Sequence, residues 1–123
     1  MKILICEDDI MTLKALEHRL KKEGYETITA ADGKQASELL QNNPEINFLL
    51  TDIHVPYISG LELISLVRDK LKKQIPIVVL TRVGLEDVVL RAFEMGADDY
   101  IVKPFSPDEL SLRIKRQVIK NNL

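Results

Sequence analysis

Short, almost continuous apolar runs recur along the chain and predict buried strands. The three clearest runs cover residues 2–6, 47–50 and 75–80. Strands that are covered on both faces by other elements have this unbroken apolar pattern. Residues 25–29 alternate between polar and apolar side chains, which is typical of a half-exposed edge strand, and residues 99–102 predict a fifth strand at the other edge.

Segments with a helical repeat of apolar side chains lie between and after these runs. In such a repeat, apolar residues recur every three or four positions and form one face of a helix. The repeat is carried by Leu13, Leu16 and Leu20, by residues 34–41, by Leu61, Ile64, Val67 and Leu71, by residues 85–96, and by Leu110, Ile114 and Val118. The chain therefore alternates strand and helix five times.

Cap signals mark several helix ends. They are Asp9, the capping boxes Ser59–Glu62 and Ser106–Glu109, and Gly96. A capping box supplies side-chain partners to the free N–H groups at a helix start, and glycine tolerates the left-handed conformation that often follows a helix end.

The alternation predicts an α/β fold. Parallel strands joined by right-handed helical crossovers form a doubly wound sheet with helices on both faces. Residues 1–123 contain no internal repeat, low-complexity segment or linker, and they are expected to form one domain.

Composition excludes several functions. A net charge of -2 with no long run of one sign argues against nucleic-acid binding by a basic surface. Cys6 is the only cysteine, which excludes an internal disulfide and a cysteine zinc site, and its apolar surroundings indicate a buried thiol. No stretch is long enough to span a membrane and no signal-peptide pattern follows Met1, so a cytoplasmic location is expected.

Polar residues with related chemistry follow four of the predicted strands. Ligands of an open parallel sheet bind beyond the carboxyl ends of its strands. The residues after these ends are Glu7, Asp8 and Asp9, then Asp52, then Thr81, and finally Lys103 and Pro104. We therefore expect carboxylates, a hydroxyl and an ammonium to meet at one edge of the sheet.

This group of side chains suits phosphoryl transfer. Crowded carboxylates repel one another and either take up a proton or recruit a cation, and their oxygens are ligands that Mg²⁺ prefers. The metal and Lys103 would neutralise charge on a transferred group, and Asp52 would attack, because a carboxylate can form an acyl phosphate. Taken singly, Asp9 and Thr81 read as cap or strand-end residues and Lys103 as a solvated side chain, but their joint placement favours the site.

Five motifs resemble the receiver domain of two-component response regulators. They are "ILICEDD", "DIHVPYISGLEL", "VVLT", "GADDYIVKPF" and "SPDELSLRIK", and they follow the family's order and spacing over essentially the whole chain. The later motifs most resemble the branch whose receivers are joined to winged-helix DNA-binding domains. The resemblance implies a flavodoxin-like (βα)5 fold with a five-stranded parallel sheet in the order 2-1-3-4-5.

The resemblance also implies ligands and partners. Asp52 would accept the phosphoryl group from a sensor histidine kinase or phosphotransfer protein. Asp8, Asp52 and the backbone carbonyl of His54 would bind Mg²⁺, with Glu7 acting partly through water. Such a protein catalyses only its own phosphorylation and dephosphorylation.

Further residues would carry the signal. Thr81 would move to the phosphoryl group, Lys103 would pair with that group, and Tyr100 would turn inward. The Lys103–Pro104 bond would be cis, which an X-Pro bond tolerates at small cost. The changed surface, which would control an output domain or effector protein, would be formed by the helix at 85–96, the strand at 99–102 and the last helix.

Two residues beside the expected site depart from the family pattern. Arg82 follows Thr81, where a small residue is usual, and His54 is uncommon two positions after Asp52. Both flank the expected phosphoryl pocket and are expected to change the rates of phosphorylation and hydrolysis. The expectation is that Arg82 lengthens the phosphorylated lifetime, whereas the sign for His54 is open.

A homodimer through the changed surface is only partly supported. Asp99 and Arg113 match one ion pair of the interface that the winged-helix branch often uses. Val89 stands where a basic partner for Glu109 is expected.

Three other functions are compatible with such a fold. An aspartyl-nucleophile phosphatase commonly carries a second acid two residues after its nucleophile, where this chain has His54, and needs a substrate-binding cap region. A phosphate-independent interaction module would be favoured if the acceptor residues were missing, but all are present. Flavin binding is disfavoured by the acidic loop "CEDDIMT".

Overall fold

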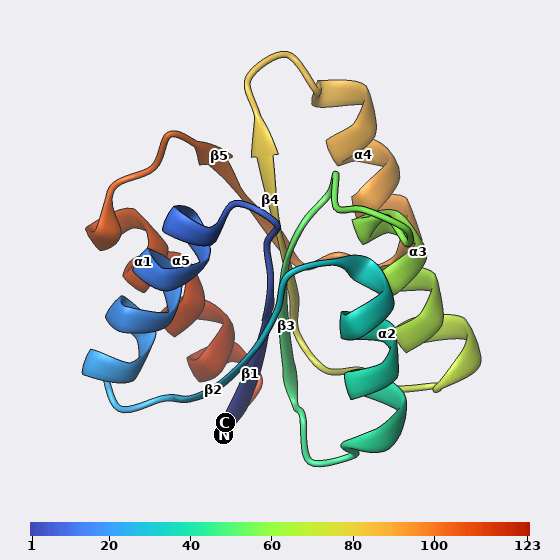
Figure 1. The fold of residues 1–123 in the computed structure, drawn as a ribbon, viewed down its shortest axis with the longest axis horizontal. Helices are drawn as coiled ribbons and strands as arrows, with labels where there is room; N and C mark the ends of the chain where they lie inside the picture. Colours follow the sequence, from blue (N-terminus) through green and yellow to red (C-terminus); the bar gives the residue numbers. More distant parts are fainter.

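The computed structural model describes all of residues 1–123 and contains one five-stranded parallel sheet (Figure 1). The strand order is β2-β1-β3-β4-β5, and all neighbouring strands are parallel. The strands are β1 (Lys2–Cys6), β2 (Glu26–Ala30), β3 (Phe48–Asp52), β4 (Ile77–Arg82) and β5 (Asp99–Lys103). The predicted fold class and strand order, with β2 and β5 at the edges, are confirmed.

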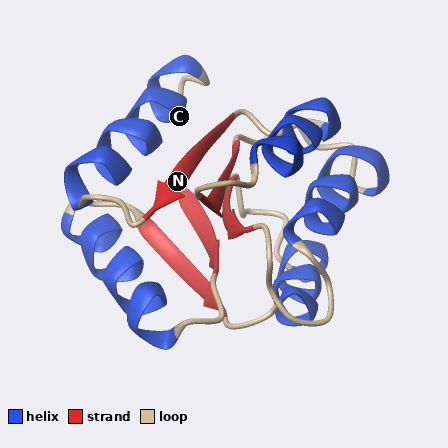
Figure 2. Ribbon diagram, turned by 90° about the horizontal axis from the view of Figure 1, so that it is seen from above, coloured by secondary structure: helices blue, strands red, loops and turns tan.

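Helices cover both faces of the sheet, as Figure 2 shows from above. One face carries α1 and α5, and the other carries α2, α3 and α4. The helices are α1 (Ile10–Lys22), α2 (Gly33–Asn42), α3 (Gly60–Ser65), α4 (Glu86–Met95) and α5 (Pro107–Lys120), and α3 continues into a π-helical turn, η1 (Leu66–Lys70). None of these helices is both long and apolar enough to cross a membrane.

Each face of the sheet has its own apolar core. Successive strand residues point to opposite faces, so Leu49 joins the core beneath α2, α3 and α4, while Phe48 and Leu50 join the core beneath α1 and α5. A strand that contributes to both cores is apolar along most of its length, which explains the continuous apolar runs. Cys6 is fully buried, as predicted, and burial raises the pKa of its thiol to about 12.

The predicted cap residues occupy cap positions. Asp9, Ser59 and Ser106 each accept a hydrogen bond from a backbone N–H in the first helical turn, at 3.2, 3.2 and 3.1 Å. Gly96 ends α4 with φ at +119°, a left-handed conformation that glycine adopts readily. These caps start α1, α3 and α5 close to the carboxyl ends of the strands that precede them.

Strands β3 and β4 extend farther toward the carboxyl edge than the apolar runs predict. β3 ends at Asp52 rather than at residue 50, and β4 continues through Thr81 to Arg82. Asp52 is in register with Leu80 on β4. Arg82 is in register with Lys103 on β5. Hydrogen bonding along the sheet, rather than loop structure, therefore holds these polar residues.

The helical segment after β3 also differs from the predicted continuous helix. It becomes π-helical at Leu66, and the N–H of Leu71 donates to the carbonyl oxygen of Leu66 at 2.8 Å. Arg68, within this turn, donates to the carbonyl oxygen of Gly96 at 2.9 Å and pairs with Asp98 at 3.1 Å. The wider turn accompanies this long-range contact with the end of α4. A local sequence pattern does not predict such a contact.

A close backbone approach joins α2 to the loop that follows β3. A β-carbon added at Gly33 would lie 1.6 Å from the carbonyl oxygen of Ile58. The N–H of Gly33 also donates to the carbonyl oxygen of Pro56 at 3.0 Å. Because the loop leads from Asp52 into α3, this contact helps to position the chain just after the end of β3.

We expect Gly33→Ala to destabilise the protein, although alanine in a helix interior is normally favoured over glycine by about 1 kcal/mol. The added methyl group would push against the backbone of Ile58, and overpacking of this kind costs about 2 kcal/mol. Lys34→Ala, at the next and exposed position of α2, should change the free energy of unfolding by less than about 0.5 kcal/mol. Urea unfolding measures both values, and a Gly33→Ala protein as stable as wild type would contradict the close contact.

Candidate functional site

The carboxyl ends of four strands bring the predicted polar residues to one edge of the sheet. Glu7 directly follows β1, Asp52 ends β3, Thr81 lies near the end of β4, and Lys103 ends β5. Asp52 lies two residues after buried Leu50 on the same strand, so its side chain points to the same face of the sheet, the one covered by α1 and α5. By the same alternation Lys103 lies on that face and Thr81 lies on the opposite face.

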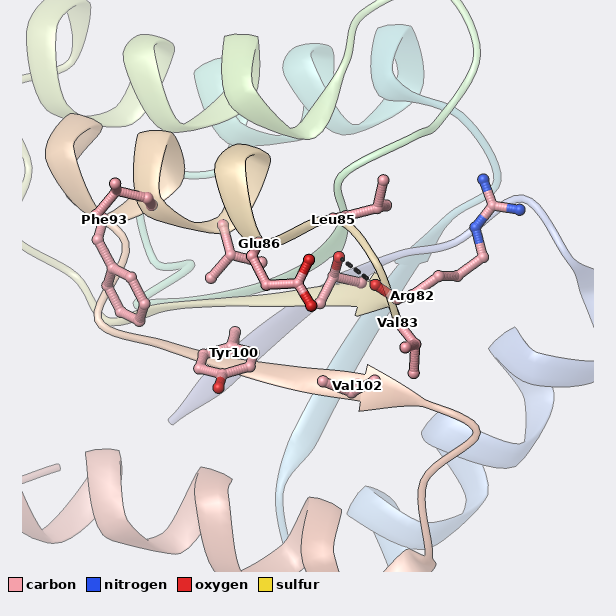
Figure 3. A pocket seen from close by; sticks show the side chains of 10 residues that line it. Arg82, Val83, Leu85, Glu86, Phe93, Tyr100 and Val102 are labelled. Atoms are coloured by element: carbon pink, nitrogen blue, oxygen red, sulfur yellow. Dashed lines mark hydrogen bonds between the residues drawn. The ribbon is translucent and has the colours of Figure 1, made fainter.

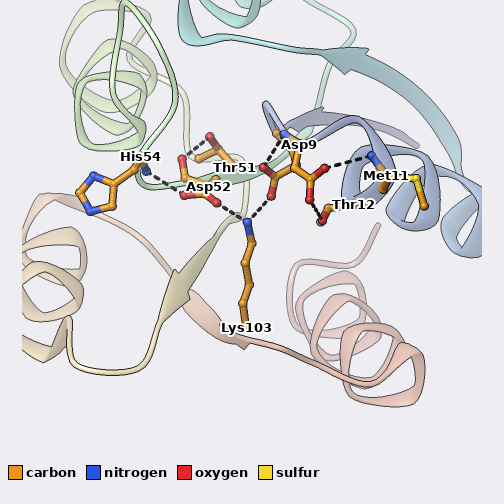
Figure 4. A network of polar contacts seen from close by, with 8 residues as sticks. Asp9, Met11, Thr12, Thr51, Asp52, His54 and Lys103 are labelled. Carbon is orange, nitrogen blue, oxygen red and sulfur yellow. Dashed lines mark hydrogen bonds and ion pairs between the residues drawn. The ribbon is translucent and has the colours of Figure 1, made fainter.

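Lys103 links two carboxylates at this edge (Figure 4). Its Nζ donates to Oε1 of Glu7 and to Oδ2 of Asp52. Only 1% of Glu7 and 9% of Asp52 is exposed, so the three charges form a largely buried cluster. Removal of the ammonium would leave two neighbouring buried carboxylates without a counter-charge, which is costly.

The buried setting shifts the pKa values of Glu7 and Lys103. Burial raises the pKa of the Glu7 carboxyl above its usual value, and the hydrogen bond from Lys103 offsets only part of this effect. Burial also disfavours the Lys103 ammonium, but hydrogen bonds to Asp52 and Glu7 outweigh that effect and raise the pKa of Lys103. Lys103 is therefore positively charged at neutral pH, and its hydrogen bond favours the ionised form of the Glu7 carboxyl.

The backbone after β3 orients the other oxygen of Asp52. Oδ1 accepts a hydrogen bond from the N–H of His54 at 2.8 Å. Gly60 packs so closely that a β-carbon there would lie 2.5 Å from the carbonyl oxygen of Asp52. The imidazole of His54 is exposed and points away from the Asp52 carboxylate (Figure 4). His54 therefore contacts the carboxylate through its backbone and not through its ring.

The two acids after Glu7 occupy different places. The Asp9 carboxylate caps α1 and accepts a hydrogen bond from the Thr12 hydroxyl at 2.8 Å. The N–H of Asp9 donates to Oε2 of Glu7 at 3.1 Å. Asp8 is exposed, so its carboxylate remains accessible from solvent at the rim of the site.

The residues of the expected Mg²⁺ site lie at this edge, and Glu7 contacts Lys103 there. No three side chains of the metal-binding types are already placed to hold an ion together. Glu7 is buried and pairs with Lys103. A buried carboxylate needs a counter-charge, and Lys103 supplies it here. Asp8, Asp52 and the carbonyl of His54 offer hard oxygen ligands only. That donor set fits Mg²⁺, which binds few protein ligands and keeps several waters.

Thr81 and Tyr100 lie beside a groove between α4 and β5 (Figure 3). The groove has a volume of about 360 Å³ and mostly apolar walls. Thr81 is buried, and its hydroxyl lies 3.4 Å from the carbonyl oxygen of Arg82, to which it donates. Tyr100 is half-buried, and its ring meets Phe93 edge to face with 5.9 Å between ring centroids. The two expected switch residues thus share one face of the sheet.

Other expected features near the site are also resolved. The Lys103–Pro104 peptide bond is cis, as the resemblance implied. Asp99 pairs with Arg113 at 2.9 Å. Arg82 is exposed and lines one end of the groove, and its guanidinium lies away from the other lining residues in Figure 3. Val89 lines that groove.

The sequence pattern does not predict two contacts that support this site. Gly33 packs against the loop after β3, and Arg68 holds the end of α4. Asp32-Gly33 indicates a turn but not the segment that will lie against it. Arg68 lies among the polar positions of an amphipathic helix, where nothing marks its partner.

The arrangement can hold negative charge that is added to Asp52. Both oxygens of its carboxylate are oriented, one by Lys103 and one by the N–H of His54. A carboxylate can attack phosphorus, and a fixed ammonium beside it can stabilise the resulting charge. The side chain of Thr81, on the neighbouring strand, supplies a hydroxyl donor close to the same strand ends.

Several known proteins are similar to this chain in sequence and in fold. A family model described as "Response regulator receiver domain" matches residues 3–115. The chain is 41% identical over 115 residues to the probable transcriptional regulator ycf27 of Cyanophora paradoxa. It is 40% identical over 114 residues to the transcriptional regulatory protein SrrA of Staphylococcus aureus. Each alignment covers 93% of this chain and 46% of the relative.

A solved structure extends the likeness to three dimensions. The crystal structure of a putative response regulator from Chloroflexus aurantiacus matches with a TM-score of 0.88 and 37% sequence identity, over 96% of this chain and 97% of that one. The chain spans about half the length of the two transcriptional regulators it matches. From the family match over most of its residues and the agreement in fold, we conclude that the chain belongs to the family of response regulator receiver domains.

Proposed function

We propose that residues 1–123 form a single receiver domain that acts as a phosphorylation-controlled switch of a two-component system. Asp52 is the acceptor, and the donor is the phosphohistidine of a sensor histidine kinase or phosphotransfer protein. The proposal is carried by the setting of the Asp52 carboxylate, with Oδ2 on Lys103 and Oδ1 on the N–H of His54. An oriented carboxylate at a strand end can meet an incoming phosphorus atom beside a ready counter-charge.

The transfer exchanges one bond to phosphorus for another. An oxygen of Asp52 attacks, the Oδ–P bond forms, and the N–P bond of the phosphohistidine breaks with its electron pair left on the imidazole nitrogen. Lys103 balances charge on the phosphoryl oxygens. Hydrolysis ends the signal, because water attacks phosphorus, the Oδ–P bond breaks, and the Asp52 carboxylate and inorganic phosphate are regenerated.

Magnesium is the cofactor that we infer for this transfer. When bound, Mg²⁺ supplies positive charge to phosphoryl oxygens. Asp8, Asp52 and the backbone carbonyl of His54 would hold it, and Glu7 would act through water because Lys103 already binds its carboxylate. Lys103 alone cannot balance Glu7 together with an acyl phosphate on Asp52, which carries about two negative charges where the free carboxylate carries one. This deficit is the physical reason for a second cation.

The signal would leave through the face formed by α4, β5 and α5. The acyl phosphate on Asp52 carries about two negative charges, one more than the free carboxylate, and it adds strong acceptor oxygens. The Thr81 hydroxyl, held only by a long contact to a backbone carbonyl, would turn toward these oxygens. Tyr100 would then move inward from its half-buried position beside Phe93. Both movements shift an existing equilibrium between two conformations.

The regulated partner is an output domain or an effector protein. The matched relatives are transcriptional regulators and are about twice as long as the aligned region, which supports a DNA-binding output domain. A homodimer through α4, β5 and α5 is the weaker part of the proposal. We place the protein in the cytoplasm, without direct nucleic-acid contacts by these residues, and without enzymatic activity beyond its own phosphorylation and dephosphorylation.

Acetyl phosphate with magnesium should add one phosphoryl group to the wild-type chain, detected by intact-protein mass spectrometry. Asp52→Asn should abolish this gain, because an amide is a poor nucleophile. Asp9→Asn should largely retain it, because asparagine also caps helices and Asp9 points into α1. Full labelling of Asp52→Asn would show that another residue is the acceptor.

Excess chelator should prevent this labelling, and Asp8→Ala should weaken both magnesium binding and labelling. The Asp8 carboxylate is exposed, and its removal takes away one of the expected Mg²⁺ ligands without leaving another group in its place. Asp87→Ala, which removes an exposed acid from α4, serves as the control and should behave as wild type. Magnesium titration followed by amide NMR shifts measures binding without the reaction, and unchanged titration of Asp8→Ala would remove Asp8 from the ligand set.

Beryllofluoride, a mimic of the phosphoryl group, should shift amide NMR signals throughout residues 84–118. These residues contain the groove and the Tyr100 side chain, whereas α2 on the far side of β3 should respond little. The largest changes are expected near Tyr100, because its ring must leave its present contact with Phe93. Shifts confined to the immediate surroundings of Asp52 would contradict the switch.

A further inference from the structure

Another cationic side chain, that of Arg82, belongs to the strand between those of Asp52 and Lys103. Arg82 ends β4, the strand that runs between the strands of Asp52 and Lys103. It is in register with Lys103, so both side chains leave the same face of the sheet at the same level. Lys103 contacts Asp52 from β5, across the width of β4. Arg82 starts one strand closer to Asp52, which is about 4.8 Å in the direction across the sheet, and its long side chain can therefore reach the same carboxylate.

No partner holds the guanidinium of Arg82. The side chain is exposed and forms no ion pair, unlike those of Arg19, Arg68 and Arg113. The guanidinium lies away from the other residues that line the groove between α4 and β5 (Figure 3). It can therefore swing over the edge of the sheet without breaking an existing contact.

Phosphorylation would create a partner for this guanidinium. Lys103 already serves both Glu7 and Asp52. The acyl phosphate on Asp52 carries about two negative charges where the free carboxylate carries one, so that with Glu7 and Asp8 the site holds about four, whereas Lys103 and one Mg²⁺ would supply only about three positive charges. A guanidinium presents a planar fork of N–H donors that binds phosphate oxygens in two places.

We propose that Arg82 closes over the phosphoryl group on Asp52 and prolongs the phosphorylated state. This inference rests on the proposed function. In hydrolysis the water oxygen must attack phosphorus in line with the Oδ–P bond, which breaks with its electron pair left on the Asp52 oxygen. A guanidinium that already binds the phosphoryl oxygens in the ground state does not favour the transition state selectively, and its bulk obstructs the approaching water.

The test measures the rate at which the phosphorylated chain loses its phosphoryl group at fixed magnesium concentration and pH, after acetyl phosphate is removed. Arg82→Ala should shorten the lifetime about fivefold, the size expected for one exposed charged contact. Arg82→Gln keeps most of the side-chain length but not the charge, and it should also shorten the lifetime. Arg91→Ala, which removes an exposed arginine from α4, is the matched control and should keep the wild-type lifetime.

Ionic strength gives a second readout. Salt screens an exposed charged contact, so added salt should shorten the wild-type lifetime and change that of Arg82→Ala much less. His54→Ala should have a smaller effect than Arg82→Ala, because the imidazole points away from Asp52. A wild-type lifetime in Arg82→Gln would overturn the charged contact.

The outcomes separate this inference from the proposed function. A wild-type chain that takes no phosphoryl group on Asp52 refutes both. A wild-type chain that is labelled on Asp52, together with an Arg82→Ala chain that loses the label at the same rate or more slowly, refutes only the role of Arg82. Slower loss would mean that the guanidinium assists hydrolysis instead of delaying it.

Discussion

The contact of one ammonium with two carboxylates is the interaction on which the site depends. Lys103 brings together Glu7 after β1 and Asp52 at the end of β3, although it belongs to β5. Two nearly buried carboxylates without this cation would repel each other and carry a desolvation cost that nothing repays. The same ammonium holds Asp52 in an orientation suited to attack. Any group added to Asp52 must then share a cation that is already in use, which makes the site sensitive to added charge.

The alternation of strand residues places the charged site and the expected switch residues on opposite faces of the sheet. Asp52 and Lys103 lie on the face covered by α1 and α5, and Arg82 is in register with Lys103. Thr81, one residue earlier, projects to the other face, where Tyr100 lines the groove beneath α4. Adjacent residues at the end of one strand therefore face the charged edge and the groove beneath α4. A change at the proposed acceptor would need to move only this strand end to affect both sides of the sheet.

Local sequence patterns contain most of the fold but only part of the site. The strands and caps such as Ser106 could be predicted from periodicity and turn chemistry, whereas the order of the strands in the sheet was implied by the family resemblance. The contact of Glu7 with Lys103 could not be predicted in this way, because the two residues lie 96 positions apart in the sequence. The contact of Gly33 with Ile58 and the π-helical turn at Arg68 depend on packing between distant segments in the same way. Periodicity reports which face of an element is buried, but not which partner covers it.

The two ends of α4 are held very differently, and this bears on how a signal can travel. Ala92 is its only fully buried residue, so the helix packs lightly against the sheet. At its far end, Arg68 fixes the carbonyl of Gly96 from η1. At the near end, Leu85 supplies no side-chain cap, and the groove leaves apolar space beside Thr81. Few contacts oppose movement where Thr81 lies, and a firm contact resists it where Arg68 lies. A displacement at the strand end would therefore tilt the near end of α4 about an anchored far end, rather than shift the whole helix.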